Sequence, residues 1–258
     1  MFVLIFIVFG AILQASGAGE ILLKMAFATT GRFAGGPAHA SIVGSALFGT
    51  MSGAAVANVV STGVFTIPII KKAGFKPKFA GAVEAAASTG GQIMPPVMGV
   101  VAFIMADVTA IPYLQIVVAA ILPAIFYYAS LFLVVLIEAR KQGIGATPKA
   151  ERMRITLPDW VKSIAFWVPL GVIVAVLLTG RTPQNAGFYA TLAATFLSLF
   201  LFPKFRHPRA WYDALVRAGK TAAQLMIIVA CVGVVIGLVN MTGIGLRFAD
   251  AIRALSGD

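Results

Sequence analysis

Two stretches of this chain combine apolar residues with groups that can coordinate an ion. Residues 49–63 read GTMSGAAVANVVSTG, and residues 84–96 read EAAASTGGQIMPP. Hydroxyl, amide and main-chain oxygens are the ligands that hard cations prefer. Glycines permit tight turns and prolines remove main-chain donors, so both stretches should contain interrupted helices with free carbonyl groups. The chemistry that they indicate is reversible binding of an ion or a small solute.

The first stretch contains several side chains that offer oxygen ligands, namely Thr50, Ser52, Asn58, Ser61 and Thr62. An unpaired amide is costly in an apolar hairpin, which favours a functional role for Asn58. Small residues also let helices pack closely in lipid, and we favour that explanation for Gly53 and residues 54–57.

The second stretch should unwind between Ser88 and Pro96, because consecutive glycines and prolines interrupt a helix there. Half-helix ends can hold a cation at their carbonyl end and an anion at their amide end. Thr89 and Gln92 are the preferred contacts with substrate or ion in this stretch. A kinked helix with a purely structural role is the alternative.

Glu84 and Asp107 are the two acidic residues expected near membrane depth. An intramembrane carboxylate is a candidate proton carrier or cation ligand. Glu84 also lies about one and a half helical turns from Lys78, so an ion pair at the membrane surface is an open alternative. Asp107 is expected near the outer head groups with a structural role, and His39 and His207 receive no role.

The composition indicates an integral membrane protein. The 258 residues are 60% hydrophobic and 11% charged, whereas soluble domains contain about 25% charged residues. The net charge of +11 lies in short loops between apolar segments, where lipid head groups explain it, so nucleic acid is not an expected partner. The single cysteine, Cys231, excludes a disulfide framework or a zinc cluster within this chain.

Patterns typical of enzymes are absent from the sequence. It contains no nucleotide-binding glycine pattern, no HExxH zinc pattern, and no defensible pair of catalytic carboxylates or Ser/His/Asp arrangement. We therefore predict a transporter rather than an enzyme. An intramembrane enzyme and a passive channel are the alternative functions.

Three loops rich in lysine and arginine orient the predicted spans. They cover residues 71–78, 138–162 and 203–220, and the last is expected to form a short amphipathic helix in the head-group layer. Placing all three in the cytoplasm satisfies the positive-inside rule. Only Arg181, Arg247 and Arg253 then lie outside.

This orientation predicts an all-α, multi-span fold with one re-entrant hairpin. The crossings between the basic loops are a broken helix over 79–111, a span over 113–136, and spans over 163–179 and 186–202. Residues 40–70 must then enter and leave the membrane on the same side, as a re-entrant hairpin. Irregular backbone at membrane depth survives where it lines a protein cavity, as in the sites of secondary transporters.

A weak internal repeat suggests inverted symmetry. Residues 7–31 resemble residues 233–257, with Gly17 and Gly19 aligned to Gly243 and Gly245. The two copies would cross in opposite directions, as inverted transporter repeats do. We therefore expect a first transport repeat over 1–140, connecting spans over 141–220, and the start of a second repeat over 221–258. Since no second hairpin follows, we expect the chain to be a fragment of a longer polypeptide.

The sequence GTMSGAAVANVVSTG followed by EAAASTGGQIMPPVMG resembles the large membrane subunit of tripartite ATP-independent periplasmic (TRAP) transporters. The sequence VEAAASTGGQIMPP is similar to the corresponding sequence in one branch of this family. In that branch the large and small subunits are fused and the binding protein is of the TAXI type. The resemblance is strong over about residues 1–140 and extends to the remainder by general layout.

The resemblance implies an elevator-type secondary transporter in a bacterial or archaeal cytoplasmic membrane. It would take small organic anions such as dicarboxylates from a periplasmic TAXI-type solute-binding protein, driven by an ion gradient, usually sodium, with no other cofactor. A small membrane subunit, fused or separate, would be a second partner. Carried onto this sequence, the family's sodium site points to Ser52, Asn58, Thr89, Gly90 and Gly91. Gln92 becomes a candidate for the lining of the substrate cavity.

Overall fold

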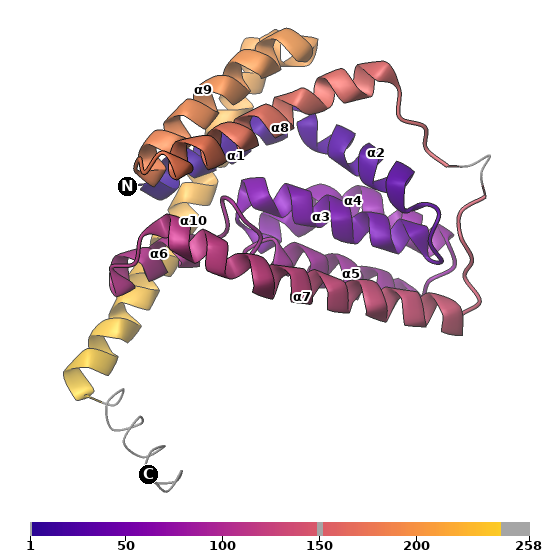
Figure 1. The fold of residues 1–258 in the computed structure, drawn as a ribbon, viewed down its shortest axis with the longest axis horizontal. Helices are drawn as coiled ribbons and strands as arrows, with labels where there is room; N and C mark the ends of the chain where they lie inside the picture. Colours follow the sequence, from indigo (N-terminus) through magenta and orange to yellow (C-terminus); the bar gives the residue numbers. More distant parts are fainter. Residues whose placement is uncertain (1, 149–151, 244–258) are drawn as a thin grey trace, which may run out of the picture. The chain divides into compact units, whose positions relative to one another are not determined.

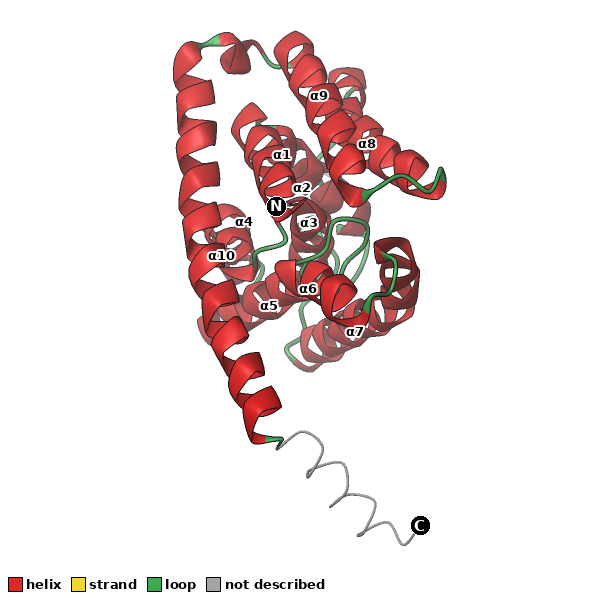
Figure 2. Cartoon of the chain, turned by 90° about the vertical axis from the view of Figure 1, so that its left-hand side faces the viewer, coloured by secondary structure: helices red, strands yellow, loops and turns green. Residues whose placement is uncertain are grey.

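The computed structural model describes residues 2–148 and 152–243, and every regular element in this part of the chain is a helix (Figure 2). This confirms the predicted all-α class. The chain forms two units, residues 1–218 and 219–258, and the described portion of the second unit continues helix α10. The elements of Figure 1 are α1 (Phe2–Ser16), α2 (Ala18–Thr30), α3 (Gly36–Ser52), α4 (Ala55–Lys72), α5 (Pro77–Gly90), α6 (Val100–Thr109), α7 (Tyr113–Lys141), α8 (Leu157–Leu178), α9 (Pro183–Leu201), the 3-10 helix η1 (Pro203–Arg206) and α10 (Pro208–Thr242).

Helices α3 and α4 form the hairpin that the sequence predicts around residues 40–70, extended at both ends. The reversal occurs at Gly53, whose φ of 57° is accessible to glycine at little cost, followed by the extended residue Ala54. The amide of Gly53 donates to the carbonyl of Gly49 at 3.0 Å and closes the end of α3. Helices α3, α4 and α5 pack against one another and form the framework of the site described below.

The predicted break in the segment 79–111 separates α5 from α6. Helix α5 begins with Pro77 at its first position and ends at Gly90, and the helical path resumes at Val100. The intervening loop is closed by the amide of Gly99, which donates to the carbonyl of Gln92 at 2.7 Å. The break therefore lies where glycines and prolines predict it.

Helices α1 and α2 form a bent pair. The chain turns by 71° at Gly17, which has a φ of +91° and follows the last residue of α1. Gly243, its counterpart in the proposed repeat, also has a positive φ (64°) and follows the last residue of α10. Most of the second copy of the repeat, residues 244–257, lies outside the described residues.

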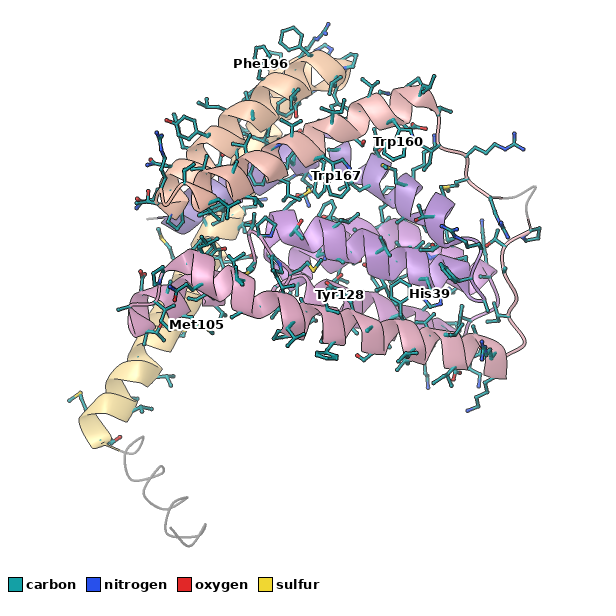
Figure 3. All side chains as sticks on the ribbon, viewed as in Figure 1. His39, Met105, Tyr128, Trp160, Trp167 and Phe196 are labelled. Atoms are coloured by element: carbon teal, nitrogen blue, oxygen red, sulfur yellow. The ribbon has the colours of Figure 1, made fainter. Side chains whose placement is uncertain are left out.

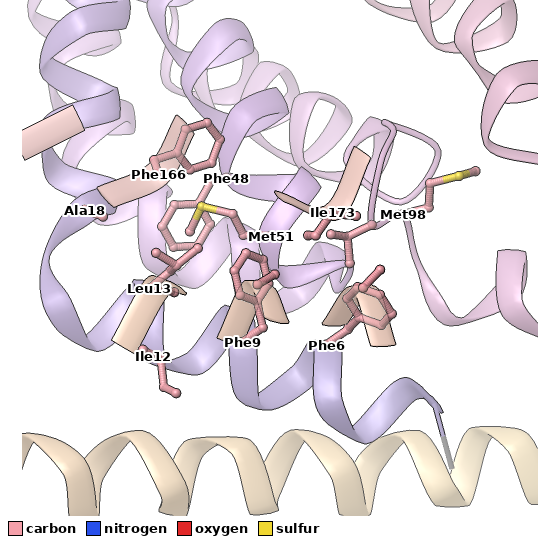
Figure 4. Close-up of a cluster of buried hydrophobic side chains, with 14 of the residues drawn as sticks. Phe6, Phe9, Ile12, Leu13, Ala18, Phe48, Met51, Met98, Phe166 and Ile173 are labelled. Atoms are coloured by element: carbon pink, nitrogen blue, oxygen red, sulfur yellow. The ribbon is translucent and has the colours of Figure 1, made fainter. Parts of the chain in front are cut away.

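A large apolar core joins α1 to α8 and α9. Its largest fully buried side chains include Phe9, Leu13, Phe166 and Ile173 (Figure 4). A second apolar cluster lies between α3, α5 and α7, around Ile42 and Val135. The first core includes residues near the hairpin tip and the break, such as Met51 and Val97, and the second includes residues nearer the start of α3 and of α5, such as Ala38 and Ala80.

Three helices in the described residues are long and apolar enough to cross a membrane: α7, α8 and α10. The bent pair of α1 and α2 would make a fourth span. The predicted span 186–202 corresponds to α9, which is not among them. The sequence also predicted a separate head-group helix over 203–220. This was wrong, because residues 203–206 form a 3-10 helix and one helix then continues from Pro208 to Thr242, through residues 218–226 (AGKTAAQLM), which contain no proline.

Candidate functional site

Glu84 lies fully buried where α3, α4 and α5 meet, and its carboxylate accepts hydrogen bonds from hydroxyl groups of all three helices. The donors are Ser41 (2.5 Å), Ser45 (2.8 Å), Thr62, Thr66 (2.5 Å) and Ser88 (3.2 Å). Glu84, these five residues and Asn58 are called the Glu84 cluster below. All of these side chains are buried.

The Glu84 cluster follows from one spacing that occurs on three helices. Each helix contributes two residues four positions apart, which lie one above the other on the same helix face. These pairs are Ser41 and Ser45 on α3, Thr62 and Thr66 on α4, and Glu84 and Ser88 on α5. Packing the three faces against each other brings the oxygens together without any irregular backbone.

Asn58 extends the cluster toward the tip of the hairpin. It is fully buried, and its Nδ2 donates to the main-chain carbonyl of Ser45 at 2.8 Å, which ties α4 to α3. Its main-chain carbonyl accepts the Thr62 hydroxyl at 2.8 Å, and its Oδ1 lies 3.4 Å from the same hydroxyl. The amide that the sequence singled out is thus partnered, and its partners belong to the Glu84 cluster.

The predicted alternative that Glu84 pairs with Lys78 is wrong. Lys78 is exposed, and the one ion pair within residues 2–148 and 152–243 joins Lys24 to Asp159 at 2.6 Å. The physical reason is that Glu84 faces inward between α3 and α4, whereas Lys78 lies on the exposed side of the first turns of α5. In the described chain, hydroxyl groups rather than a cationic side chain stabilise the carboxylate.

The tip of the hairpin touches the break after α5 through main-chain atoms. A methyl group added at Gly49 would lie 2.3 Å from Cα of Gly91, and one added at Gly91 would lie 2.6 Å from Cα of Gly49. A methyl group at Gly53 would lie 2.4 Å from the carbonyl oxygen of Met98. Only glycine permits this approach, so the small residues of the two stretches bring the two interruptions into contact.

The remaining predicted site residues lie on both sides of this contact. Ser52 is the last residue of α3, at the hairpin tip. Gly90 is buried, and a methyl group there would lie 2.4 Å from the Tyr127 ring. Thr89 and Gln92 are exposed, and the Thr89 hydroxyl donates to the carbonyl of Ala85 in its own helix at 2.8 Å. Binding of sodium by Ser52, Asn58 and Thr89 stays a prediction.

Neither Asp107 nor His39 is among the hydrogen-bond partners of Glu84. Asp107 is exposed near the end of α6. His39 of α3 is labelled in Figure 3; it is buried, and its ring stacks on that of Phe132 of α7, with 4.6 Å between the ring centroids. The described residues contain no group of three or more His, Cys, Asp or Glu side chains that could hold a metal.

A cavity of residues 1–218, with a volume of about 780 Å³, is lined by none of the residues of the Glu84 cluster. Its walls come from α1, α2, α4 and α8, which contribute Lys24, Phe65, Asp159 and Lys162, and from Phe202 at the end of α9. None of the predicted ion or substrate contacts lines this cavity.

Sequence reasoning missed Ser41, Ser45 and Thr66 as members of a site. The signal that could have found them is the spacing of four between polar residues, repeated on three neighbouring apolar segments. Polar side chains are costly in such segments unless they find partners. Three aligned polar pairs, one with a carboxylate, indicate that they partner one another.

A helical hairpin in contact with a broken helix, among apolar helices long enough to span a bilayer, is an arrangement typical of membrane transport proteins. The family model described as "Tripartite ATP-independent periplasmic transporter, DctM component" matches residues 1–258. The chain therefore belongs to the DctM family, the large permease component of TRAP transporters.

Individual relatives agree with this membership. The chain is 28% identical over 233 residues to the C4-dicarboxylate TRAP transporter large permease protein DctM of Pseudomonas aeruginosa, covering 87% of this chain and 52% of that protein. It is 23% identical to the 2,3-diketo-L-gulonate TRAP transporter large permease protein YiaN of Escherichia coli, covering 97% and 58%. Identity to the sialic acid TRAP transporter permease protein SiaT of Haemophilus influenzae is 22%, covering 97% and 40%. The chain spans about half the length of the curated relatives it matches.

Proposed function

We propose that this chain forms part of the permease of a TAXI-type TRAP secondary transporter that takes up small organic anions, driven by an ion gradient. Membership of the DctM family supports the transporter class. The substrates in the relatives' names, a C4-dicarboxylate, a diketogulonate and sialic acid, are carboxylates, which supports an organic anion. The resemblance of the sequence of residues 83–96 to TAXI-type permeases supports membership of the TAXI branch.

The observation that carries this proposal is the main-chain contact between Gly49 at the hairpin tip and Gly91 at the break. Both interruptions leave carbonyl and amide groups without helical partners, and the contact gathers them at one place. Carbonyl ends of half-helices attract cations and amide ends attract anions. A coupling cation and a substrate carboxylate can therefore bind side by side, which is the requirement for coupled transport.

The proposed assembly contains further components. A periplasmic TAXI-type solute-binding protein delivers the anion, and a small membrane subunit, fused or separate, completes the permease in the cytoplasmic membrane of a bacterium or archaeon. Since the chain spans about half the length of its relatives, a second hairpin and broken helix in the longer polypeptide would complete the cavity. A passive channel or an intramembrane enzyme is the competing function.

Reconstitution of the full-length permease into liposomes with its binding protein tests the proposal. Uptake of a labelled carboxylate should require an inward ion gradient. On the sodium prediction, Asn58→Ala or Thr89→Ala should raise the sodium concentration needed for half-maximal uptake. Thr191→Ala is a matched control for Thr89, because the Thr191 hydroxyl also bonds the carbonyl four residues earlier, on a helix outside the site.

Each competing outcome has a distinct signature. Uptake that needs no gradient would indicate a channel, and turnover of a reporter lipid or peptide without uptake would indicate an enzyme. Unchanged sodium dependence in both variants would contradict the assignment of Asn58 and Thr89 as sodium contacts while leaving the transport proposal intact.

A further inference from the structure

We propose that the cavity of about 780 Å³ lined by α1, α2, α4 and α8 is a phospholipid site, in which Lys162 and Lys24 bind the phosphate and the acyl chains lie along α4. The site goes beyond the proposed function and does not depend on it. It shares no residue with the Glu84 cluster or with the predicted ion and substrate contacts.

Helices α2 and α8 give the cavity a cationic end. Oδ2 of Asp159 accepts hydrogen bonds from Lys24 at 2.6 Å and from the main-chain amide and the hydroxyl of Thr156 at 2.8 and 2.7 Å. Lys162 lies three residues after Asp159 and also lines the cavity, and it forms no ion pair within the described residues. Glu20, the other acid of the wall, is exposed and likewise unpaired in that part of the chain. The Lys162 ammonium group therefore lacks a counter-ion, which a phosphate supplies.

The wall contributed by α4 is apolar and continues beyond the cavity. Phe65 and Ile69 line the cavity and lie four positions apart, on one face of the helix. Phe65 is 52% exposed, and beside it Val64, Val60 and Val56 form a stripe that is 65–78% exposed. From residue 69 back to residue 56 the helix rises by about 20 Å, and one leaflet of the hydrocarbon core is about 15 Å thick. The stripe is therefore long enough to accompany an acyl chain from the cavity toward the hairpin tip.

The start of α8 has the features of a segment at the lipid head groups. Trp160 lies between Asp159 and Lys162 in the sequence and is 55% exposed (Figure 3). Exposed tryptophan is typical of the membrane–water interface, and a lysine stem can lie along apolar surface while its ammonium group reaches the head groups. Helix α8 is apolar enough to cross a membrane. A phosphate at Lys162 therefore lies at the depth expected for a head group.

The walls of the cavity favour a lipid over the small organic anion that the permease is proposed to carry. Sites for small solutes place several convergent polar groups around the ligand. Here the uncharged polar side chains of the wall are already bonded, because Gln14 donates to Ser61 of α4 at 2.7 Å and Ser16 donates to the carbonyl of Leu13 at 2.8 Å. The ammonium groups remain at one end, and aromatic and aliphatic side chains remain elsewhere. This division matches an amphiphile.

Photolabelling of the full-length permease tests the proposal. The protein is stripped of lipid in a maltoside detergent, which has no phosphate, and receives phosphatidylglycerol with a photoreactive group on one acyl chain. Mass spectrometry should then locate the label on α4 between residues 56 and 69. Diacylglycerol with the same photoreactive chain lacks the phosphate and should label this segment far less. Unlabelled phosphatidylglycerol should compete with the labelled lipid.

Two variants separate the charged end from the apolar wall. Lys162→Gln should reduce labelling about fivefold, the factor that corresponds to about 1 kcal/mol for one lysine at a phospholipid surface. Lys78→Gln is the matched control, because it removes an exposed lysine that does not line the cavity. Ile69→Trp fills part of the cavity, retains both lysines, and should also reduce labelling. Thermal unfolding without lipid verifies that each variant is folded.

Several results would overturn the proposal. These are the absence of label on α4, equal labelling by phosphatidylglycerol and diacylglycerol, and unchanged labelling in folded Lys162→Gln. Protection by inorganic phosphate but not by phosphatidylglycerol would show an anion site that has no place for acyl chains. Protection by a carboxylate substrate alone would assign the cavity to the solute. Failure of the permease to take up any organic anion would refute the proposed function and leave the lipid site intact.

Discussion

The Glu84 cluster and the apolar core of α1, α8 and α9 are both fully buried, yet they are held together by different forces. The apolar core contains aromatic and aliphatic side chains such as Phe9, Phe166 and Ile173 (Figure 4). The Glu84 cluster consists of a carboxylate and its hydroxyl donors. Dispersion and shape hold the first, and directional hydrogen bonds hold the second.

The comparison separates residues that stabilise the fold from residues that are expected to serve transport. An apolar core tolerates rearrangement among residues of similar volume, because none of its contacts is directional. A buried polar cluster is stable only when every member is partnered, so it defines one arrangement of three helices. A polar cluster costs more to bury than an apolar one, and in a membrane protein that cost usually indicates function. Changes in the apolar core should therefore reduce stability, and changes around the Glu84 cluster should reduce transport.

The largest expected effect is on the apolar core. Phe9→Ala should lower the free energy of unfolding by about 3–5 kcal/mol, because it leaves a cavity at a fully buried site. Unfolding of the full-length permease in detergent would measure this. Phe196→Ala, at a site that is 63% exposed in the same region (Figure 3), should change stability far less. Equal losses in the two variants would show that packing does not distinguish the regions.

The next effect is at the contact between the hairpin tip and the break. Gly49→Ala should block the approach of Gly91 and abolish uptake, with a loss of stability of about 1–3 kcal/mol from overpacking. Uptake per folded molecule and thermal unfolding measure the two effects. Gly81→Ala is the matched control, because a methyl group there meets nothing within 4 Å. Normal uptake in Gly49→Ala would show that close approach of the two interruptions is dispensable.

The smallest effect is expected for the ion pair between α2 and α8. Lys24 is half-exposed and bonds Asp159, which also accepts hydrogen bonds from Thr156 at the start of α8. Ion pairs near a protein surface contribute little to stability, so Lys24→Met should lower the free energy of unfolding least among these changes. A double-mutant cycle with Asp159→Asn would isolate the interaction. A coupling energy as large as the effect of Phe9→Ala would contradict this ranking.

Local sequence chemistry determined much of this fold. Glycine at position 53 and the run from Gly90 to Pro96 interrupt helices wherever they occur, because they free or restrict the backbone directly. The hairpin and the break were therefore predictable from the sequence. Residue composition likewise determined the membrane class. The continuous helix α10 was not predicted. The basic residues of 203–220 suggested a separate element that ends at residue 220, whereas the helix continues through this position.

Only the tertiary structure decided which oxygens meet. The sequence shows Ser41, Thr62 and Glu84 on separate segments, and it left Glu84 equally able to face Lys78 or the protein interior. Packing of α3 against α4 and α5 turned Glu84 inward and surrounded it with hydroxyl groups. The reason is that spacing along one helix fixes the face on which a residue lies, whereas the partner of that face depends on how the helices pack.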